Sequence, residues 1–254
     1  MASPQNEASH SKSHATDWRI TSGSMRKEIV ARLAESEDLA GQPMRKLRLL
    51  AAHMLVGHFE KRIVIHDEES ANGFIYVLLS GIGRLTCLNR AHRRILLDVL
   101  GPGNFMCIPP LLLDVRRGVR FESVTECEVG RIVPKLMIQD ITGLKIDGFG
   151  LVLRLTCGRW WELLVRHSTY VEQTLNERVV LSLLELAPKI GRKGSHQNKH
   201  SIIDITHQDL AHLVHGSRAR VSRCLGRLAA RKAIAQQGPT QLVIFPDRLG
   251  AMLV

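Results

Sequence analysis

The sequence predicts an α+β fold in three parts: an N-terminal double-stranded β-helix (jelly-roll) domain, a long helix and a C-terminal winged helix-turn-helix. Short β-like runs separated by turn signals fill residues 60 to 132. An apolar stripe with helical spacing follows at residues 149 to 170, and a helix, turn, helix and hairpin pattern begins at Asp204. Many short strands at regular spacing are typical of a sandwich or roll, whereas a period near 3.6 residues indicates a helix.

Composition and charge narrow the class of protein. The chain has 254 residues, 44% of them hydrophobic and 23% charged, so two domains with ordinary cores are expected. The net charge of +11 favours a polyanionic partner. From residue 177 onward there are twelve Lys and Arg against five Asp and Glu, so the positive charge is concentrated near the C-terminus.

The sequence also lacks several targeting and binding signals. No apolar run has the length of a membrane span, and the polar N-terminus lacks the apolar stretch of a signal peptide, so we expect a cytoplasmic protein with no membrane partner. The five cysteines are widely spaced without a CxxC pair. Neither a disulfide framework nor a cysteine-based metal site is predicted, and any metal remains unknown.

We divide the chain into four segments. Residues 1–24 are polar and lack apolar periodicity, which predicts a flexible tail. Residues 25–136 are expected to form the β-roll sensor domain with flanking helices, residues 137–176 the long dimerisation helix, and residues 177–254 the winged helix-turn-helix.

The long helix is expected to need a partner. Its apolar positions fit spacings of three, four and seven, and they are Phe149, Leu153, Trp160, Leu163 and Tyr170. An apolar stripe on a helix between two domains must be covered by other apolar side chains. The same helix of a second copy of the chain is the simplest source of them. The sequence therefore predicts a homodimer, with packing of the stripe on the chain's own β-domain as the alternative.

The segment from Asp204 carries a helix-turn-helix pattern. Thr206 followed by Asp209 predicts the start of one helix, because the hydroxyl can cap first-turn amides and the carboxylate faces the positive helix end. Gly216 suits the tight turn, and Ser217 is expected to cap the second helix. The apolar runs on either side of QQGPT then predict the hairpin wing.

The second helix has a packing face and a basic face. Arginine is suited to bidentate contact with guanine, and early residues of a recognition helix reach base edges, so Arg218 and Arg223 are the first candidates for base contact. A solvated arginine face is the alternative, although caps, turn, spacing and hairpin here occur in the order that DNA binding requires. The predicted DNA-binding residues are Thr206, His207, Ser217, Arg218, Arg220, Ser222, Arg223 and Arg227.

These features resemble the CRP/FNR family of bacterial transcription regulators over about residues 45 to 246. The resemblance rests on IYVLLSGIGRLTCLN and LGPGNF in the roll, ECEVGRI after it, and ITHQDLAHLVHGSRARVSRCLGRLAARKAI in the C-terminal part. It implies a cyclic-nucleotide-binding-type roll, a dimerisation helix and a winged helix-turn-helix that binds DNA.

The recognition helix departs from the family pattern at one position. In the family a helix of the form SRETVSR contributes two arginines and a glutamate, which correspond here to Arg218, Arg223 and Ala219. Ala219 cannot accept a hydrogen bond from cytosine, so the resemblance implies an operator unlike that of members that keep the glutamate. Arg220 is a candidate for compensating contact.

The roll departs from the nucleotide-binding pattern as well. Arg117 aligns with the family's phosphate-binding arginine, but Gly118 replaces the hydroxyl residue and no glutamate follows shortly after Phe105. Cyclic AMP or GMP is therefore not expected as the effector. No cysteine precedes Cys87, so an oxygen-labile iron–sulfur cluster is not expected either.

Haem stays open as an alternative cofactor. Cys107 falls where the carbon-monoxide-sensing haem members place a cysteine ligand, although Pro109 stands about where they have a histidine. Trp160, Trp161, Arg166 and His167 lie where the family's long helix faces the ligand cavity, with dimer packing as the alternative for them. The candidate effector pocket consists of Cys107, Arg117, Trp160, Arg166 and His167.

The resulting expectation is a sequence-specific transcription regulator that acts as a dimer on palindromic double-stranded DNA, with half-sites ~34 Å apart. An effector or redox signal in the roll would control it, and RNA polymerase is the expected protein partner. The alternatives are a constitutive DNA-binding dimer with a vestigial pocket and a haem-based gas sensor. An enzyme is not expected, because the GxSxG, HExxH, P-loop and paired-carboxylate signatures are missing.

Overall fold

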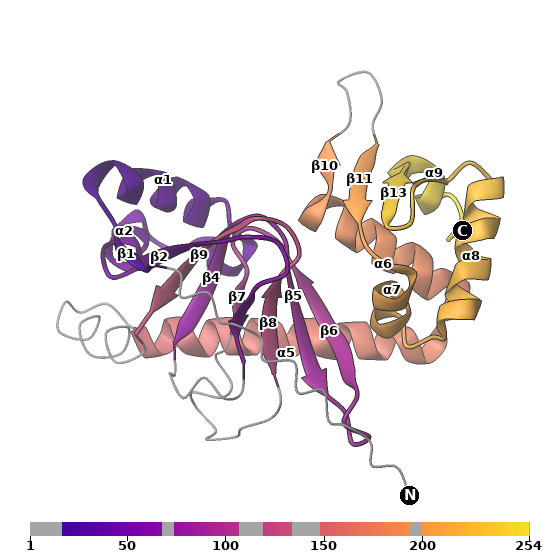
Figure 1. The fold of residues 1–254 in the computed structure, drawn as a ribbon, viewed down its shortest axis with the longest axis horizontal. Helices are drawn as coiled ribbons and strands as arrows, with labels where there is room; N and C mark the ends of the chain where they lie inside the picture. Colours follow the sequence, from indigo (N-terminus) through magenta and orange to yellow (C-terminus); the bar gives the residue numbers. More distant parts are fainter. Residues whose placement is uncertain (1–16, 68–73, 107–118, 134–147, 194–199, 254) are drawn as a thin grey trace, which may run out of the picture.

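The computed structural model describes residues 17–67, 74–106, 119–133, 148–193 and 200–253. In this part of the chain a β-roll is followed by one long helix and then by a C-terminal helical unit with its own small sheet (Figure 1). The α+β class and the order of the three parts are as the sequence predicts. No helix among the described residues combines the length and the apolar character that crossing a membrane requires.

The β-roll consists of two antiparallel sheets. The first has the strand order β1 (Arg19–Ile20), β2 (Leu55–Phe59), β9 (Cys127–Ile132), β4 (Ile75–Ser80) and β7 (Phe105–Met106). The second has the order β3 (Val64–His66), β8 (Arg120–Ser123), β5 (Gly83–Leu88) and β6 (Arg94–Leu100). Alternation of side chains along each strand sends every second residue inward, so Tyr76, Leu78 and Val129 of the first sheet share an apolar cluster with Phe121 and Leu100 of the second.

The opposite face of the first sheet is covered by two helices. These are α1 (Gly23–Ala34) and α2 (Met44–Ala52), joined through the 3-10 helix η1 (Glu37–Leu39). Leu33 and Leu50 of the helices pack in one cluster with Val77 of β4. Ser22 caps α1 by accepting from the Met25 amide, which explains where that helix begins.

The predicted tail of residues 1–24 is wrong for its last part. Arg19 pairs with Val56 as an edge strand, and Gly23 already begins α1. The Trp18 ring lies 5.4 Å from the ring of Phe59, and the guanidinium of Arg131 lies 4.2 Å from the Trp18 ring. This segment is held by one aromatic side chain and a two-residue strand. Its sequence therefore contains no repeating apolar pattern from which its structure could be predicted. Residues 1–16 lie outside the described residues.

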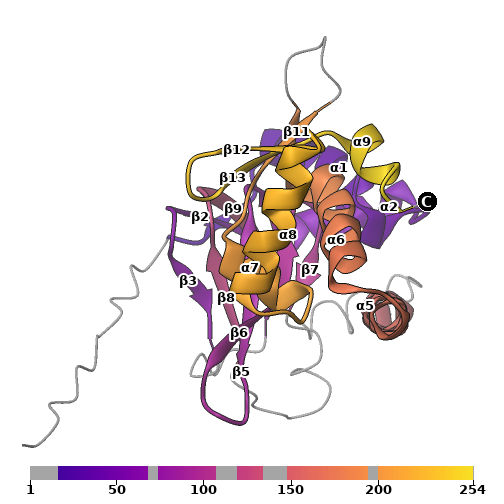
Figure 2. The ribbon, with the colours of Figure 1, turned by 90° about the vertical axis from the view of Figure 1, so that its right-hand side faces the viewer.

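The long helix is α5 (Gly148–Glu172), and residues 137–147 of the predicted segment lie outside the described residues. Near its start, Leu151 and Leu155 are buried in the cluster formed by α1, α2 and the first sheet. The helix then continues past the roll to the C-terminal unit (Figure 1) and is seen end-on in Figure 2, to one side of the sheets. Its first turns therefore pack on the chain's own β-domain, and its second half reaches the C-terminal unit.

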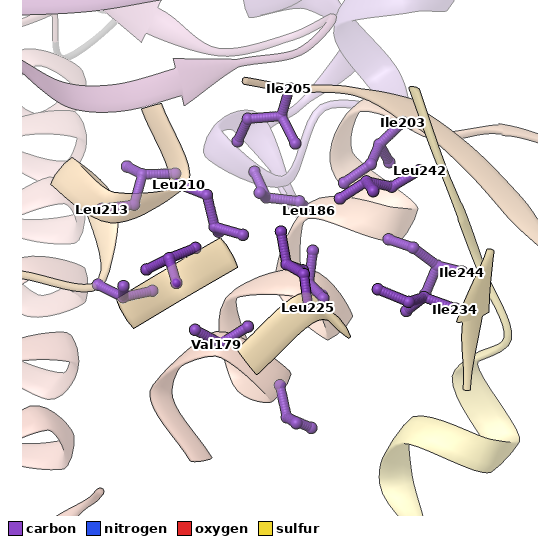
Figure 3. Close-up of a cluster of buried hydrophobic side chains, with 14 of the residues drawn as sticks. Val179, Leu186, Ile203, Ile205, Leu210, Leu213, Leu225, Ile234, Leu242 and Ile244 are labelled. Carbon is purple, nitrogen blue, oxygen red and sulfur yellow. The ribbon is translucent and has the colours of Figure 1, made fainter. Parts of the chain in front are cut away.

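The C-terminal unit contains four helices and a four-stranded sheet among the described residues. The helices are α6 (Leu175–Ile190), α7 (His207–Leu213), α8 (Arg218–Ala230) and α9 (Pro246–Gly250). The sheet order is β10 (Arg192–Lys193), β11 (Ser201–Asp204), β13 (Gln241–Ile244) and β12 (Ile234–Gln237). Figure 3 shows how Leu186 of α6, Leu210 of α7, Leu225 of α8 and Ile244 of β13 converge on one core.

Strand β6 joins the roll to this unit. Leu96 and Val99 of β6 are buried in the same apolar cluster as the helix-turn-helix core. The Leu96 amide donates to Nδ1 of His212 on α7 over 3.3 Å, and Lys189 of α6 binds Asp98 with an N–O distance of 3.2 Å. These apolar, hydrogen-bonded and ionic contacts fix the C-terminal unit against the roll.

Candidate nucleic-acid interface

Two capped helices form the core of the candidate site. The Thr206 hydroxyl accepts from the Asp209 amide over 3.0 Å and donates to the Asp209 carboxylate over 2.8 Å, which starts α7. The Ser217 hydroxyl accepts from the Arg220 amide over 3.4 Å, which starts α8. Both caps lie at the residues that the sequence predicts, so two predicted DNA-binding residues, Thr206 and Ser217, have a structural role in shaping the site.

The backbone of the turn between the two helices differs from the prediction. The left-handed backbone conformation belongs to His215, with φ of 52°, and not to Gly216. Gly216 is needed instead for close approach to α6, because a Cβ there would lie 2.8 Å from Cδ1 of Leu175. Since Leu175 is the first residue of α6, the absence of a side chain at Gly216 sets how closely the turn and α6 pack.

His215 also contacts the end of the long helix. Its ring stands edge-on to Tyr170 of α5, with 5.6 Å between ring centroids, and Tyr170 in turn hydrogen-bonds Ser182 of α6 over 3.0 Å. Burial, followed by the neighbouring charges of Arg178, His167 and Arg166, lowers the pKa of His215 below its usual value. The turn is thus tied to α5 by a histidine that favours its neutral form.

Helix α8 has one buried face and one basic face. Val221, Cys224, Leu225 and Leu228 are buried. On the other side the exposed residues are Arg218, Ala219, Arg220, Arg223, Gly226, Arg227, Ala229 and Ala230. Figure 2 shows α8 on the outside of the molecule, next to α7 and the hairpin of β12 and β13. An exposed helix with this charge can enter the major groove of DNA, which admits an α-helix.

A cavity of about 240 Å³ lies between α8 and the start of α6. It is lined by Thr174, Leu175, Asn176, Arg220, Arg223, Cys224 and Arg227. Three guanidinium groups and the positive end of a helix meet there, so the cavity suits an anionic oxygen such as that of a DNA phosphate. Thr174 caps α6 in a capping box with Glu177, and this hydrogen bonding lowers the pKa of Glu177.

Asn176 ties α6 to α8 at the floor of this cavity. Its side-chain oxygen accepts from Arg227 over 2.6 Å and from the Cys224 thiol over 2.8 Å. On the α7 side, Nδ1 of His207 and the Ser222 hydroxyl form a hydrogen bond of 2.8 Å. Three of the predicted DNA-binding residues, His207, Ser222 and Arg227, are therefore already engaged in holding the helices together.

The wing is present where the sequence predicts it. Strands β12 and β13 pair antiparallel, with Gln237 opposite Gln241, and Gly238 at the tip has φ of 82°. Lys232, just before the hairpin, has φ of 56°, and its carbonyl accepts from the Arg248 guanidinium over 2.9 Å. The hairpin tip thus lies at the surface of the same unit as α8.

Three of the five candidate effector residues, Trp160, Arg166 and His167, lie on α5 in the described part of the chain. Cys107 and Arg117 lie outside the described residues. Trp160 and His167 are exposed on α5. Arg166 is largely buried between the two parts of the molecule, where it binds Glu185 of α6 over 2.6 Å and lies 3.8 Å from Asp98 of β6.

Sequence reasoning missed several residues of the interface. Thr174 and Asn176 border the arginine cavity, and their signal was available, because Thr174 and Glu177 have the spacing of a capping box. Asp98 and Lys189 gave no signal, since their contact joins positions far apart in the chain. Within the described residues no group of three His, Cys, Asp or Glu side chains is arranged to hold a metal ion.

Comparison with known proteins identifies both parts of the chain. The sequence pattern of the Crp-like helix-turn-helix domain matches residues 177–251, and that of the cyclic nucleotide-binding domain matches residues 58–139. A search among curated proteins gave no significant match.

Solved structures of bacterial regulators have the same fold. FixK2 from Bradyrhizobium japonicum is 18% identical, with 78% of this chain and 96% of that chain covered and a TM-score of 0.63. The c-di-GMP responsive global regulator CLP from Xanthomonas campestris is 20% identical, with 80% and 99% covered and a TM-score of 0.61. A CRP family transcriptional regulator from Thermus thermophilus is 20% identical, with 76% and 94% covered and a TM-score of 0.61.

Both domain patterns occur in one chain, in the order and fold of these regulators, and the capped helix pair carries the exposed arginines. The chain therefore belongs to the CRP/FNR family of transcription regulators, with a cyclic-nucleotide-binding-type domain followed by a Crp-like helix-turn-helix domain.

Proposed function

We propose that the chain acts as a homodimer that binds a palindromic DNA operator through α8 and is controlled by a signal sensed in the β-roll. Arg218 and Arg223 reach base edges in the major groove, and Arg220 and Arg227 neutralise phosphates beside the cavity at the start of α6. Ser217, Thr206, His207 and Ser222 position the two helices. RNA polymerase is the protein partner of such a regulator, a part of the proposal that rests on the family alone.

One observation carries the dimer: a stripe of apolar side chains on α5 is exposed, and it shares Leu153 and Trp160 with the predicted stripe but not Tyr170, which is half-buried. Leu153, Trp160, Leu164 and Val171 are 50%, 60%, 40% and 73% exposed and follow one another at spacings of seven, four and seven. Such a line is the seam of a two-helix coiled coil, and a large apolar surface left in water is costly. A symmetric pairing of two α5 helices covers it with the same residues from both copies.

Sedimentation of the full-length protein tests the seam. Leu164→Glu places a charge within the stripe, so the wild-type protein is expected to sediment as a dimer and this variant as a monomer. Gly158→Glu is the matched control, because Gly158 is exposed on α5 away from the stripe and a Cβ there meets nothing within 4 Å. If the Leu164→Glu protein is still a dimer, α5 is not the dimer interface.

A constitutive regulator is the second candidate, and packing inside the roll favours it. Phe121 and Leu78 are fully buried between the two sheets, together with Tyr76, so side chains of the protein occupy part of the space between the sheets. Operator binding by the purified protein, measured with and without a low-molecular-weight cell filtrate, separates the two. Equal affinity in both conditions supports the constitutive regulator, and a change in affinity supports an effector.

A further inference from the structure

The outer face of α8 is centred on Ala219 and Arg223. The buried residues Val221, Cys224, Leu225 and Leu228 define the inward direction of this helix. At 3.6 residues per turn each residue advances by about 100°, so Ala219 and Arg223 lie almost opposite the middle of the buried face. These two residues are one turn apart and lie on the side of the helix that would face a DNA groove.

Two other polar side chains of α8 are held by neighbouring elements. Arg227 donates to Asn176 and Ser222 is hydrogen-bonded to His207, while Arg220 and Arg223 both border the cavity at the start of α6. Within the described residues Arg223 forms no ion pair, and its side chain is exposed. The centre of the outer face thus presents one guanidinium and, one turn nearer the helix start, one exposed methyl group.

We propose that Ala219 determines specificity by contacting the C5-methyl group of a thymine close to the guanine bound by Arg223. The major-groove edge of thymine carries a methyl group that small apolar side chains such as alanine contact, whereas guanine offers two acceptors to arginine. Residues one turn apart are separated by about 5.4 Å along the helix, so the two bases lie within about two base pairs. This inference rests on the proposed function, in which α8 enters the major groove.

Base selection followed by removal of one methyl group tests the contact. The full-length protein selects binding sites from a random duplex library, with and without a low-molecular-weight cell filtrate. We expect a motif with a guanine and a thymine within two base pairs of it in each half-site. Replacing this thymine by deoxyuridine removes only the methyl group and should weaken binding roughly fourfold per half-site, while the same change at thymines outside the half-sites has no effect.

Variants at position 219 link the methyl effect to this residue. Ala219→Gly should bind the thymine and deoxyuridine sites equally, because the contacting methyl group is gone. Ala219→Glu should select cytosine in place of thymine, since a carboxylate accepts from the cytosine amino group. Ala229→Gly is the matched control: Ala229 is exposed on α8 about a quarter turn away from the outer face, so removal of its methyl group should leave the thymine preference unchanged.

The outcomes separate this inference from the function on which it rests. Enrichment of no motif under either condition would contradict sequence-specific DNA binding and the inference with it. A selected motif whose deoxyuridine form binds as tightly as the thymine form would overturn the role of Ala219 and leave the proposed function standing. The same holds if Ala219→Glu selects the wild-type motif.

Discussion

At the scale of single residues, the turn before α8 depends on two neighbours with different tasks. His215 supplies the left-handed backbone with φ of 52°, and Gly216 allows α6 to approach. The side chain of His215 contacts Tyr170, so the residue that bends the chain also links the turn to α5. A non-glycine residue with positive φ carries strain, which these contacts offset.

Histidine ionisation makes stability depend on pH. Burial lowers the pKa of both His66 and His215, against the opposing charge of Asp67 at His66 and with the help of Arg178, His167 and Arg166 at His215. In the unfolded chain these imidazoles bind protons near their ordinary pKa, while in the folded protein they bind protons only at lower pH. The stability they contribute is therefore complete above about pH 6.5 and declines as the pH falls below that value.

Urea unfolding at pH 7.5 and pH 5.5 measures this dependence. We expect a lower midpoint at pH 5.5, and a smaller difference between the two pH values for His215→Asn. Asparagine tolerates the left-handed conformation but does not titrate, so the backbone of the turn is preserved. An unchanged pH difference in the variant would show that His215 does not contribute.

At the scale of elements, the parts that follow local rules could be predicted from the sequence. The caps at Thr206 and Ser217 and the helices after them are set by residues three positions apart, so a pattern shows them. The contact of Trp18 with Phe59 and the contacts of Asp98 depend on partners far away in the chain. Local patterns give no information on such pairings, which is why the tail boundary was wrong and the link to β6 was missed.

The link through β6 gives a prediction about the junction of roll and DNA-binding unit. Asp98, Lys189 and Arg166 have side chains that are 16%, 18% and 17% exposed, so the ion pairs among them are poorly screened. Asp98→Asn leaves two largely buried cations without their shared carboxylate, which should cost about 1 to 3 kcal/mol of folding stability.

Hydrogen exchange locates the effect. In Asp98→Asn we expect faster exchange of backbone amides in β6 and α7, and unchanged exchange in α1 and α2. Glu185→Gln is the comparison, because Glu185 is 48% exposed and among these charges it contacts Arg166 alone. Equal exchange in wild-type and Asp98→Asn protein would mean that the ion pairs of Asp98 do not hold the junction.

At the scale of the whole molecule, positive charge and geometry support the same partner. The net charge of +11 attracts DNA of any sequence through counterion release, and this term weakens with salt. Selectivity has to come from the few side chains that reach base edges. In the proposed function those side chains are Arg218, Ala219 and Arg223 of α8. Arg223 also borders the cavity at the start of α6, together with Arg220 and Arg227.

The most direct test of the account is the affinity of the full-length protein for its selected operator and for a scrambled duplex of equal length. Arg223→Ala is predicted to lose about 1 to 3 kcal/mol of binding to the operator and little to the scrambled duplex. Arg220→Ala, which removes the proposed phosphate contact, should weaken both similarly and reduce the salt dependence. If Arg223→Ala keeps the full operator preference, α8 does not read DNA in the way proposed.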